Sequence, residues 1–231
     1  MDKNFKVRVM IGFSMFAVAL VGLYTFDSIP FKIIFGFFSA MSMIELLSFF
    51  KKKCTIYNIV LSLIEIVLLI GGTVFVMRVD LDHFWYIILG VCGYDIFAYL
   101  FGKLCGGKIF KKSRPFPRIS KNKTWEGTFL GLLTATLFVG IKILNQNSFD
   151  TDWVFLLCGP LALIGDLIES YIKRKFEVKD SNEIIIKNKF FKYVEMLVGG
   201  SEGHGGFLDR VDSTAFTGTV LLVIILVVFG L

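Results

Sequence analysis

The stretch TIYNIVLSLIEIVLLIGGTVFVM, residues 55–77, decides the fold class of this chain. It contains a single charged residue, Glu65, in 23 positions. An α-helix rises 1.5 Å per residue, so about 20 apolar residues cross a hydrocarbon layer about 30 Å thick. The stretch is therefore long enough to span a membrane as a helix.

The rest of the chain has the same character. Of its 231 residues, 55% are hydrophobic and 19% are charged, and the mean hydropathy is +0.71. These values exclude an ordinary soluble protein. The 26 Phe and 22 Gly, beside only 4 Pro, fit helices with small-residue contacts better than an outer-membrane barrel. The four cysteines form no Cys-x-x-Cys pair, so neither a zinc site nor a disulfide framework is supported.

Apolar runs of sufficient length predict an all-α, polytopic transmembrane bundle of about seven spans. The runs are residues 9–25, 29–50, 55–77, 84–101, 127–144, 153–169 and 213–231. The first run follows three basic residues, as a signal peptide would. No small-x-small cleavage site follows it, so we expect a retained span.

The basic residues predict the orientation of these spans. If the N-terminus is cytoplasmic, the inner segments hold 22 of the 25 Lys and Arg. These inner segments are residues 1–8, 51–54, 102–126 and 170–212. By the positive-inside rule we expect a cytoplasmic N-terminus and an outer C-terminus. A bacterial inner membrane is the simplest setting.

Two inner loops, residues 102–126 and 170–212, are too long and too specifically arranged in Gly, Lys and Asp to be plain connectors. We expect function to lie there, in a polar cleft that faces the cytoplasm. The chain then divides into N-terminal transmembrane helices, residues 1–94, and a catalytic transmembrane region with these two loops, residues 95–231.

The end of the sixth span carries a polar helical face. Asp166, Ser170, Lys173 and Arg174 follow one another at i, i+4, i+7 and i+8. A carboxylate followed by a hydroxyl and two cations suits a metal ion bound to phosphates. The alternative is the basic end of a transmembrane helix, whose long side chains reach the membrane surface.

A glycine-rich turn, GHGGFLDRVDS at residues 203–213, precedes the last span. Backbone N–H groups in such a turn bind anions. Asp209 and Asp212 lie i, i+3 on the helix that it opens, and two carboxylates beside the turn favour Mg²⁺. The alternative is an ordinary helix start with acidic residues that complement the helix dipole, in which His204 only caps or packs.

The first long loop ends in ISKNKTWEG, residues 119–127. Lys121 and Lys123 suit a triphosphate or a lipid phosphate. Trp125 either stacks on a base or lies in the interfacial aromatic belt.

The second, third and fourth predicted spans each contain one carboxylate. Asp95 begins a small-residue face at the inner end of the fourth span, and an intramembrane carboxylate is a functional candidate. Glu45 and Glu65 have no evident basic partner. Each of these two either lines a substrate groove or makes an interhelical hydrogen bond.

In their order along the chain, the motifs resemble those of the phosphatidate cytidylyltransferase family, also called CDP-diacylglycerol synthases. The family signature, a Ser followed by Lys-Arg, Lys-Asp and His-Gly-Gly-x-x-Asp-Arg-x-Asp, is matched by Ser170, Lys173-Arg174, Lys179-Asp180 and residues 204–212. Its Ser-Pro-Lys-Lys-Thr-Trp-Glu-Gly box resembles residues 120–127, and its Asp-x-x-Ala-Tyr-x-x-Gly box resembles residues 95–102. The matches span about half of the chain.

The resemblance implies transfer of CMP from CTP to phosphatidate, which gives CDP-diacylglycerol and pyrophosphate. It implies Mg²⁺ as the cofactor, with a second cation left open, and a homodimer that binds CTP, phosphatidate and membrane lipid but no nucleic acid. It assigns Mg²⁺ to Asp166 and Asp209. The further catalytic candidates are Asp212, Asp180, Lys173 and Arg174. The candidates for substrate binding are Ser120, Lys121, Lys123, Thr124, Trp125, Glu126, Ser170, Lys179, His204, Gly205, Gly206, Arg210, Asp95 and Tyr99.

The chain departs from the family pattern at three places. Residues 181–203 lengthen the signature and predict an inserted, interfacial amphipathic segment. Glu202 replaces a Pro, and Lys121-Asn122 replace Pro-Lys. The alternatives are a membrane nucleotidyltransferase with another lipid or nucleotide substrate, and a non-enzymatic lipid-binding or transport protein. A CDP-alcohol phosphatidyltransferase is excluded because its Asp-Gly-x-x-Ala-Arg run is absent.

Overall fold

The computed structural model describes residues 29–111, 114–147, 152–179, 181–183 and 206–229. All regular secondary structure in these residues is helical, which confirms the predicted all-α class. Six helical stretches are long and apolar enough to cross a membrane, so the chain is a polytopic integral membrane protein. They are Ile29–Lys51, Ile56–Arg78, Leu81–Leu104, Trp125–Gln146, Trp153–Lys175 and Leu208–Val228. The predicted first span, 9–25, lies outside the described residues.

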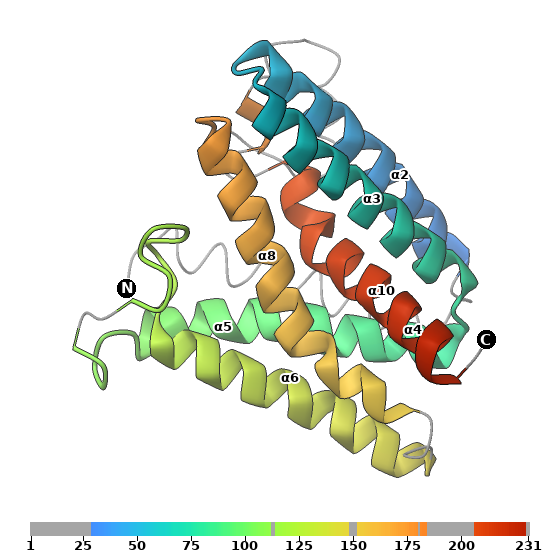
Figure 1. The fold of residues 1–231 in the computed structure, drawn as a ribbon. Coiled ribbons are helices and arrows are strands. Elements are labelled where there is room, and N and C mark those ends of the chain that lie inside the picture. Colours follow the sequence, from blue (N-terminus) through green and yellow to red (C-terminus); the bar gives the residue numbers. More distant parts are fainter. Residues whose placement is uncertain (1–28, 112–113, 148–151, 180, 184–205, 230–231) are drawn as a thin grey trace. The chain divides into compact units, whose positions relative to one another are not determined.

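Figure 1 labels the α-helices. The first two stretches are α2 (Ile29–Ser48) with the 3-10 turn η1 (Phe49–Lys51), and α3 (Ile56–Arg78). The third joins α4 (Leu81–Ile87), the π-helical turn η2 (Ile88–Cys92) and α5 (Gly93–Leu104). The others are α6 (Trp125–Gln146), η3 (Trp153–Leu157) with α8 (Cys158–Lys175), and α10 (Leu208–Phe229), with the short turn η4 (Ser181–Glu183) before α10.

Two helices extend beyond their apolar runs into the predicted inner loop 170–212. The apolar runs end at residue 169 and begin again at residue 213, whereas α8 continues to Lys175 and α10 begins at Leu208, which confirms the helical spacing predicted for both motifs. Hydropathy falls at the first charged residues, whereas a helix continues as long as its backbone hydrogen bonds form. The polar residues of the two motifs therefore lie on helices.

The described residues form two compact units. One unit contains Arg78–Leu163 together with residues 29–31, and the other contains Lys32–Met77 together with the described residues from Ile164 onward. The predicted division into residues 1–94 and 95–231 concerns function, whereas these units are defined by contacts between residues, so that division stays a prediction.

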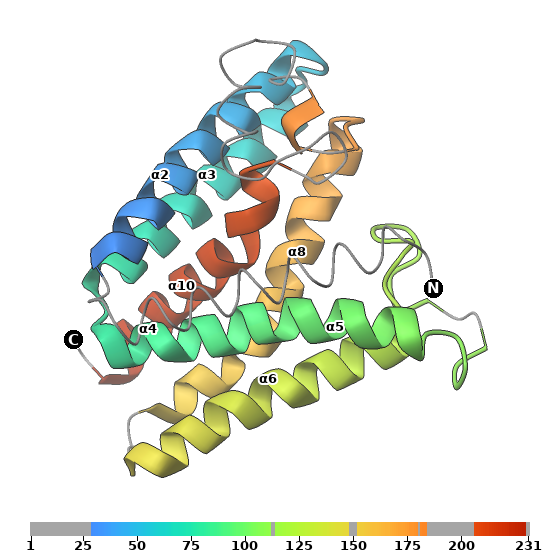
Figure 2. The same cartoon turned by 180° about the vertical axis from the view of Figure 1, so that it is seen from behind.

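In the first unit, α5 and α6 lie side by side (Figures 1 and 2). Their contact is made by small residues, with Gly127 and Gly131 of α6 against Ala98 and Gly102 of α5. A Cβ atom at Gly131 would lie only 2.7 Å from the Cβ of Ala98. Small residues let helix backbones approach closely in membranes. The contact confirms the small-residue face predicted to begin at Asp95.

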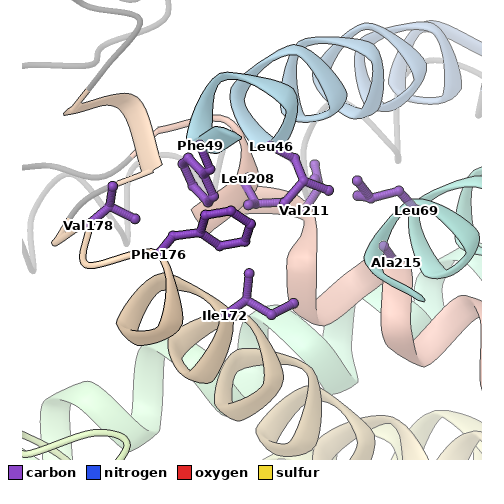
Figure 3. Packing of buried hydrophobic residues seen from close by; sticks show 9 residues of the cluster. All are labelled: Leu46, Phe49, Leu69, Ile172, Phe176, Val178, Leu208, Val211 and Ala215. Atoms are coloured by element: carbon purple, nitrogen blue, oxygen red, sulfur yellow. The ribbon is translucent and has the colours of Figure 1, made fainter. Parts of the chain in front are cut away.

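In the second unit, α2, α3 and α10 run beside one another (Figures 1 and 2). Figure 3 shows the buried cluster that joins them to the end of α8. Its members are Leu46, Phe49, Leu69, Ile172, Phe176, Val178, Leu208, Val211 and Ala215. Since Leu208, Val211 and Ala215 recur at i, i+3 and i+7, they place one face of α10 in this core. Asp209 and Asp212, which lie between these core positions, are then available for polar contacts.

Candidate active site

Three carboxylates meet where α8 and α10 pack together. One oxygen atom each of Asp166, Glu169 and Asp212 lies within 4.8 Å of the others. Glu169 and Asp212 are buried, and Asp166 is half-buried. Gly165 allows the close approach of the helices, because a Cβ at that position would lie 2.9 Å from the Cα of Ser213. The packing of the two helices thus concentrates negative charge at one place.

Lys173 connects this cluster of carboxylates to Asp209. Its ammonium nitrogen lies 2.7 Å from Glu169 Oε2 and also contacts Asp209 Oδ1. The second oxygen of Asp209, Oδ2, accepts hydrogen bonds from Ser181 Oγ and from the backbone N–H of Gly206, each at 2.8 Å. Donors of the protein therefore hold both oxygens of Asp209. The assignment of a metal ion to Asp209 stays a prediction.

The cluster of three carboxylates suits a hard divalent cation. Mg²⁺ prefers oxygen ligands and commonly binds a few carboxylates together with substrate phosphates. Within the described part of the chain, Glu169 Oε1 is buried and has no hydrogen-bond partner. A buried carboxylate oxygen without a partner is costly, and a bound cation would remove that cost. The residues present are thus suitable for the predicted Mg²⁺.

Glu169 is the member of this group that the sequence analysis missed. It follows Asp166 by three residues, so it lies on the same helical face. Ser170 and Lys173 were chosen at the i+4 and i+7 positions counted from Asp166, and Glu169 at the i+3 position was not considered. A search that gave equal weight to the i+3 and i+4 spacings would have found Glu169.

The remaining predicted residues around α8 and α10 differ in how exposed they are, and some lie outside the described residues. Ser170 Oγ donates a hydrogen bond to Asp166 Oδ1 at 3.4 Å, as the predicted helical face requires. Arg174 and Lys179 are exposed, and Arg210 is half-buried. Three candidates lie outside the described residues, namely Asp180, His204 and Gly205. The same holds for residues 184–203 of the predicted amphipathic insertion.

A second set of predicted residues belongs to the other compact unit. Lys123 Nζ donates a hydrogen bond to the hydroxyl of Tyr94 at 3.2 Å. Lys121, Asp95 and Tyr99 are exposed, which suits contacts with a ligand or a lipid headgroup. Ser120 is half-buried.

Three residues of the Thr-Trp-Glu box also build local structure. The Thr124 hydroxyl accepts the N–H of Gly127 at 3.1 Å and so caps the start of α6. Glu126 Oε1 accepts two backbone N–H groups of the preceding loop at 3.0 and 3.1 Å. The Trp125 ring stacks on that of Phe129, with centroids 5.5 Å apart. The substrate contacts expected for these residues stay predictions.

Ion pairs join two of the predicted inner segments. Lys52 lies 2.9 Å from Glu183, and Lys53 contacts Glu177 just after α8. The hydrogen bond and the positive charge of Lys53 hold the pKa of Glu177 below its usual value. Segments 51–54 and 176–183 therefore lie at the same end of their unit, as the predicted topology requires.

These features define an integral membrane protein in which α8 and α10 together carry a candidate cation site with an adjoining lysine. Residues 75–186 match the model of the Cytidylyltransferase family. The chain is 31% identical to the phosphatidate cytidylyltransferase of Rickettsia felis, over 96% of this chain and 92% of that protein. It is 33% identical to the phosphatidate cytidylyltransferase of Rickettsia conorii, over 72% of this chain and 69% of that protein.

The chain therefore belongs to the phosphatidate cytidylyltransferase family, and it is a nucleotidyltransferase. The region matched by the family model includes the α8 residues Asp166, Glu169 and Lys173. The alignment with the Rickettsia felis protein covers nearly the whole chain. No solved structure matches the chain.

Proposed function

We propose that this enzyme transfers CMP from CTP to phosphatidate and so forms CDP-diacylglycerol and pyrophosphate. The observation that carries the proposal is the cluster of three carboxylates, from Asp166, Glu169 and Asp212, beside Lys173. A transfer between phosphates needs groups that neutralise phosphate oxygens, and this cluster suits a cation that would do so. The names of the Rickettsia relatives supply the substrate class.

In the proposed reaction, an oxygen of the phosphatidate phosphate attacks the α-phosphorus of CTP. A new phosphorus–oxygen bond forms while the bond from the α-phosphorus to the bridging oxygen breaks, and pyrophosphate leaves with that electron pair. The protein mainly has to position the two substrates and balance their charges. Asp166, Glu169 and Asp212 would hold Mg²⁺, which supplies positive charge to the phosphate oxygens.

The cationic side chains would bind the phosphates directly. Lys173 is held between two carboxylates, which fixes its ammonium group beside the cation site. Arg174 and Lys179 are exposed near the end of α8, and Arg210 lies in the first turn of α10. An arginine forms paired hydrogen bonds with phosphate oxygens, whereas a lysine acts as a point charge. We assign these four residues to the phosphate groups of CTP and phosphatidate.

We also propose that the site faces the cytoplasm from a bacterial inner membrane, and that the enzyme is a homodimer. The distribution of Lys and Arg supports this orientation. The ion pairs at segments 51–54 and 176–183 are consistent with it. So is the contact between Lys142 and Asp82, at 3.2 Å. By the same charge distribution, residues 78–83 form an outer loop and Lys142 lies near the outer end of the predicted span 127–144. The family resemblance supports the dimer.

The test is the formation of CDP-diacylglycerol from CTP and phosphatidate by purified protein in liposomes, with and without Mg²⁺. We expect Mg²⁺-dependent product from the wild type and a loss of roughly 100-fold or more in Asp166→Asn, because a ligand charge is removed. Asp82→Asn makes the same substitution far from the site in sequence and should retain activity.

Two outcomes would contradict the proposal. If the wild type binds CTP but makes no product from phosphatidate, the enzyme is a related nucleotidyltransferase that acts on another lipid. If the folded protein does not bind CTP, the substrate assignment is wrong as a whole.

A further inference from the structure

Glu45 is a buried carboxylate on α2, outside every motif that the sequence analysis singled out. Its side chain is only 1% exposed. Its two oxygens accept backbone N–H groups from the start of α10. Glu45 Oε1 accepts from Phe207 at 3.0 Å, and Oε2 accepts from Leu208 at 2.8 Å. The first of these contacts joins residues that are 162 positions apart in the chain.

These hydrogen bonds fix the beginning of a helix. The first N–H groups of an α-helix have no acceptor within the helix itself. A carboxylate suits this position because it interacts favourably with the positive end of the helix dipole, and charge-assisted hydrogen bonds are stronger than neutral ones. Of the two readings left open for Glu45, the structure gives the interhelical hydrogen bond.

The same turn holds Asp209. The N–H of Gly206, next to Phe207, donates to Asp209 Oδ2 at 2.8 Å and lies 3.1 Å from Ser181 Oγ. Gly206 also has to be a glycine for the carboxylate to approach, since a Cβ there would lie 2.6 Å from Glu45 Oε2. The carboxylate of Glu45 therefore holds the backbone of Phe207 and Leu208, directly before Asp209 and one helical turn before Asp212.

Glu65 provides a contrast within the same unit. It is also a glutamate in a membrane-spanning helix, and it is 3% exposed. Among the described residues its Oε2 atom has no hydrogen-bond partner. Two buried glutamates are therefore similar in depth of burial and in residue type, but only Glu45 is shown to bind the backbone at the start of α10.

We propose that Glu45 is a positioning residue for the cation site. By binding the N–H groups of Phe207 and Leu208, it fixes the first turns of α10 and so keeps Asp212 beside Asp166 and Glu169. The proposal rests on the proposed function only for its effect on catalysis. The placement of α10 and the binding of Mg²⁺ can be measured without any reaction.

The test compares Glu45→Gln with Glu65→Gln in the full chain. Glutamine keeps one acceptor oxygen but replaces the other with an NH₂ donor, so one of the two N–H groups loses its partner. We expect faster hydrogen exchange in peptides that cover residues 206–212 of Glu45→Gln. We also expect a rise of roughly tenfold or more in the Mg²⁺ concentration for half-maximal activity, the size seen when supporting residues of metal sites are changed. Glu65→Gln should match the wild type in both.

A readout independent of activity is the rise in unfolding temperature on addition of Mg²⁺ alone. This rise should be smaller in Glu45→Gln than in the wild type and in Glu65→Gln, because weaker binding stabilises the folded state less. Unchanged exchange at 206–212 and an unchanged Mg²⁺ response in Glu45→Gln would overturn the proposal. A wild type that makes no CDP-diacylglycerol would instead overturn the proposed function, and the exchange and unfolding measurements would still decide the role of Glu45.

A second variant covers the case in which Glu45→Gln does not fold. Glu45→Asp retains the charge but is shorter by one methylene, so it cannot reach both N–H groups with the same geometry. We expect the rise in unfolding temperature on addition of Mg²⁺ to be smaller in Glu45→Asp than in the wild type. A response identical to that of the wild type would show that the reach of Glu45 has no role in placing α10.

Discussion

Gly206 lies against two polar side chains that hold the start of α10. A Cβ added there would collide with the Glu45 carboxylate and with Ser181 Oγ. Both are ends of side chains and can move, but moving them breaks their hydrogen bonds to Phe207, Leu208 and Asp209. We therefore expect Gly206→Ala to lower the free energy of unfolding by about 1–3 kcal/mol. Its Mg²⁺ requirement should rise as in Glu45→Gln.

A double-mutant cycle checks this explanation. If the added methyl group acts by displacing Glu45, the effects of Gly206→Ala and Glu45→Ala should be far from additive, because both remove the same hydrogen bonds. Thermal unfolding in detergent and the Mg²⁺ titration give the two free energies. Additive effects would mean that the glycine is needed for another reason.

Individual residues also show what sequence periodicity can and cannot find. Asp166, Ser170 and Lys173 were predicted to share a face because they lie on one helix, and α8 confirms that face. Glu169 was within reach of the same rule at the i+3 spacing. For Glu45 the sequence left an interhelical hydrogen bond as one of two alternatives, but it could not predict the partner, because Phe207 is distant in sequence and the contact exists only after three-dimensional packing.

The pair α5 and α6 illustrates prediction at the level of helices. The small residues of α5 were recognised as a face, but their partner helix could not be known before Gly127 and Gly131 were seen against Ala98. The apolar runs within α8 and α10 are shorter than the helices, because hydropathy registers the change from apolar to polar residues and not the end of backbone hydrogen bonding. The spacing of the polar motifs, in contrast, predicted that both helices continue past these runs. The sequence pattern thus identified the helices better than their partner helices.

We expect Gly131→Ala to weaken the contact between these two helices. The new Cβ would lie 2.9 Å from the Cα and the backbone nitrogen of Ala98, which cannot move without shifting α5. The predicted cost is about 1–3 kcal/mol, which is typical of overpacking. Gly140→Ala on the same helix is the matched control, since its Cβ would lie 3.8 Å from Leu156, an ordinary contact. That control should be neutral or stabilising by up to about 1 kcal/mol in thermal unfolding.

The topology of the whole chain rests on two independent observations. The first is that Lys and Arg are concentrated in alternate loops, which predicts the sidedness of each loop. The second is that Lys52 and Lys53 contact the segment after α8, so two predicted inner loops meet at one end. Hydropathy and charge predict the alternation of the loops, whereas the contact between loops distant in sequence is seen only in the fold.

The exposed thiol of Cys54, in the predicted inner loop 51–54, tests this orientation directly. A membrane-impermeant maleimide should fail to label Cys54 in intact spheroplasts of expressing bacteria and should label it after permeabilisation. The Cys54→Ser variant serves as the background control, because any labelling that it shows comes from the other cysteines. Asp82→Cys in the Cys54→Ser background places a thiol in residues 78–83, which the charge distribution predicts to lie outside, and it should react before permeabilisation. Labelling of Cys54 in intact spheroplasts would reverse the topology, and the proposed site would then be separated by the membrane from the cytoplasmic CTP that the reaction needs.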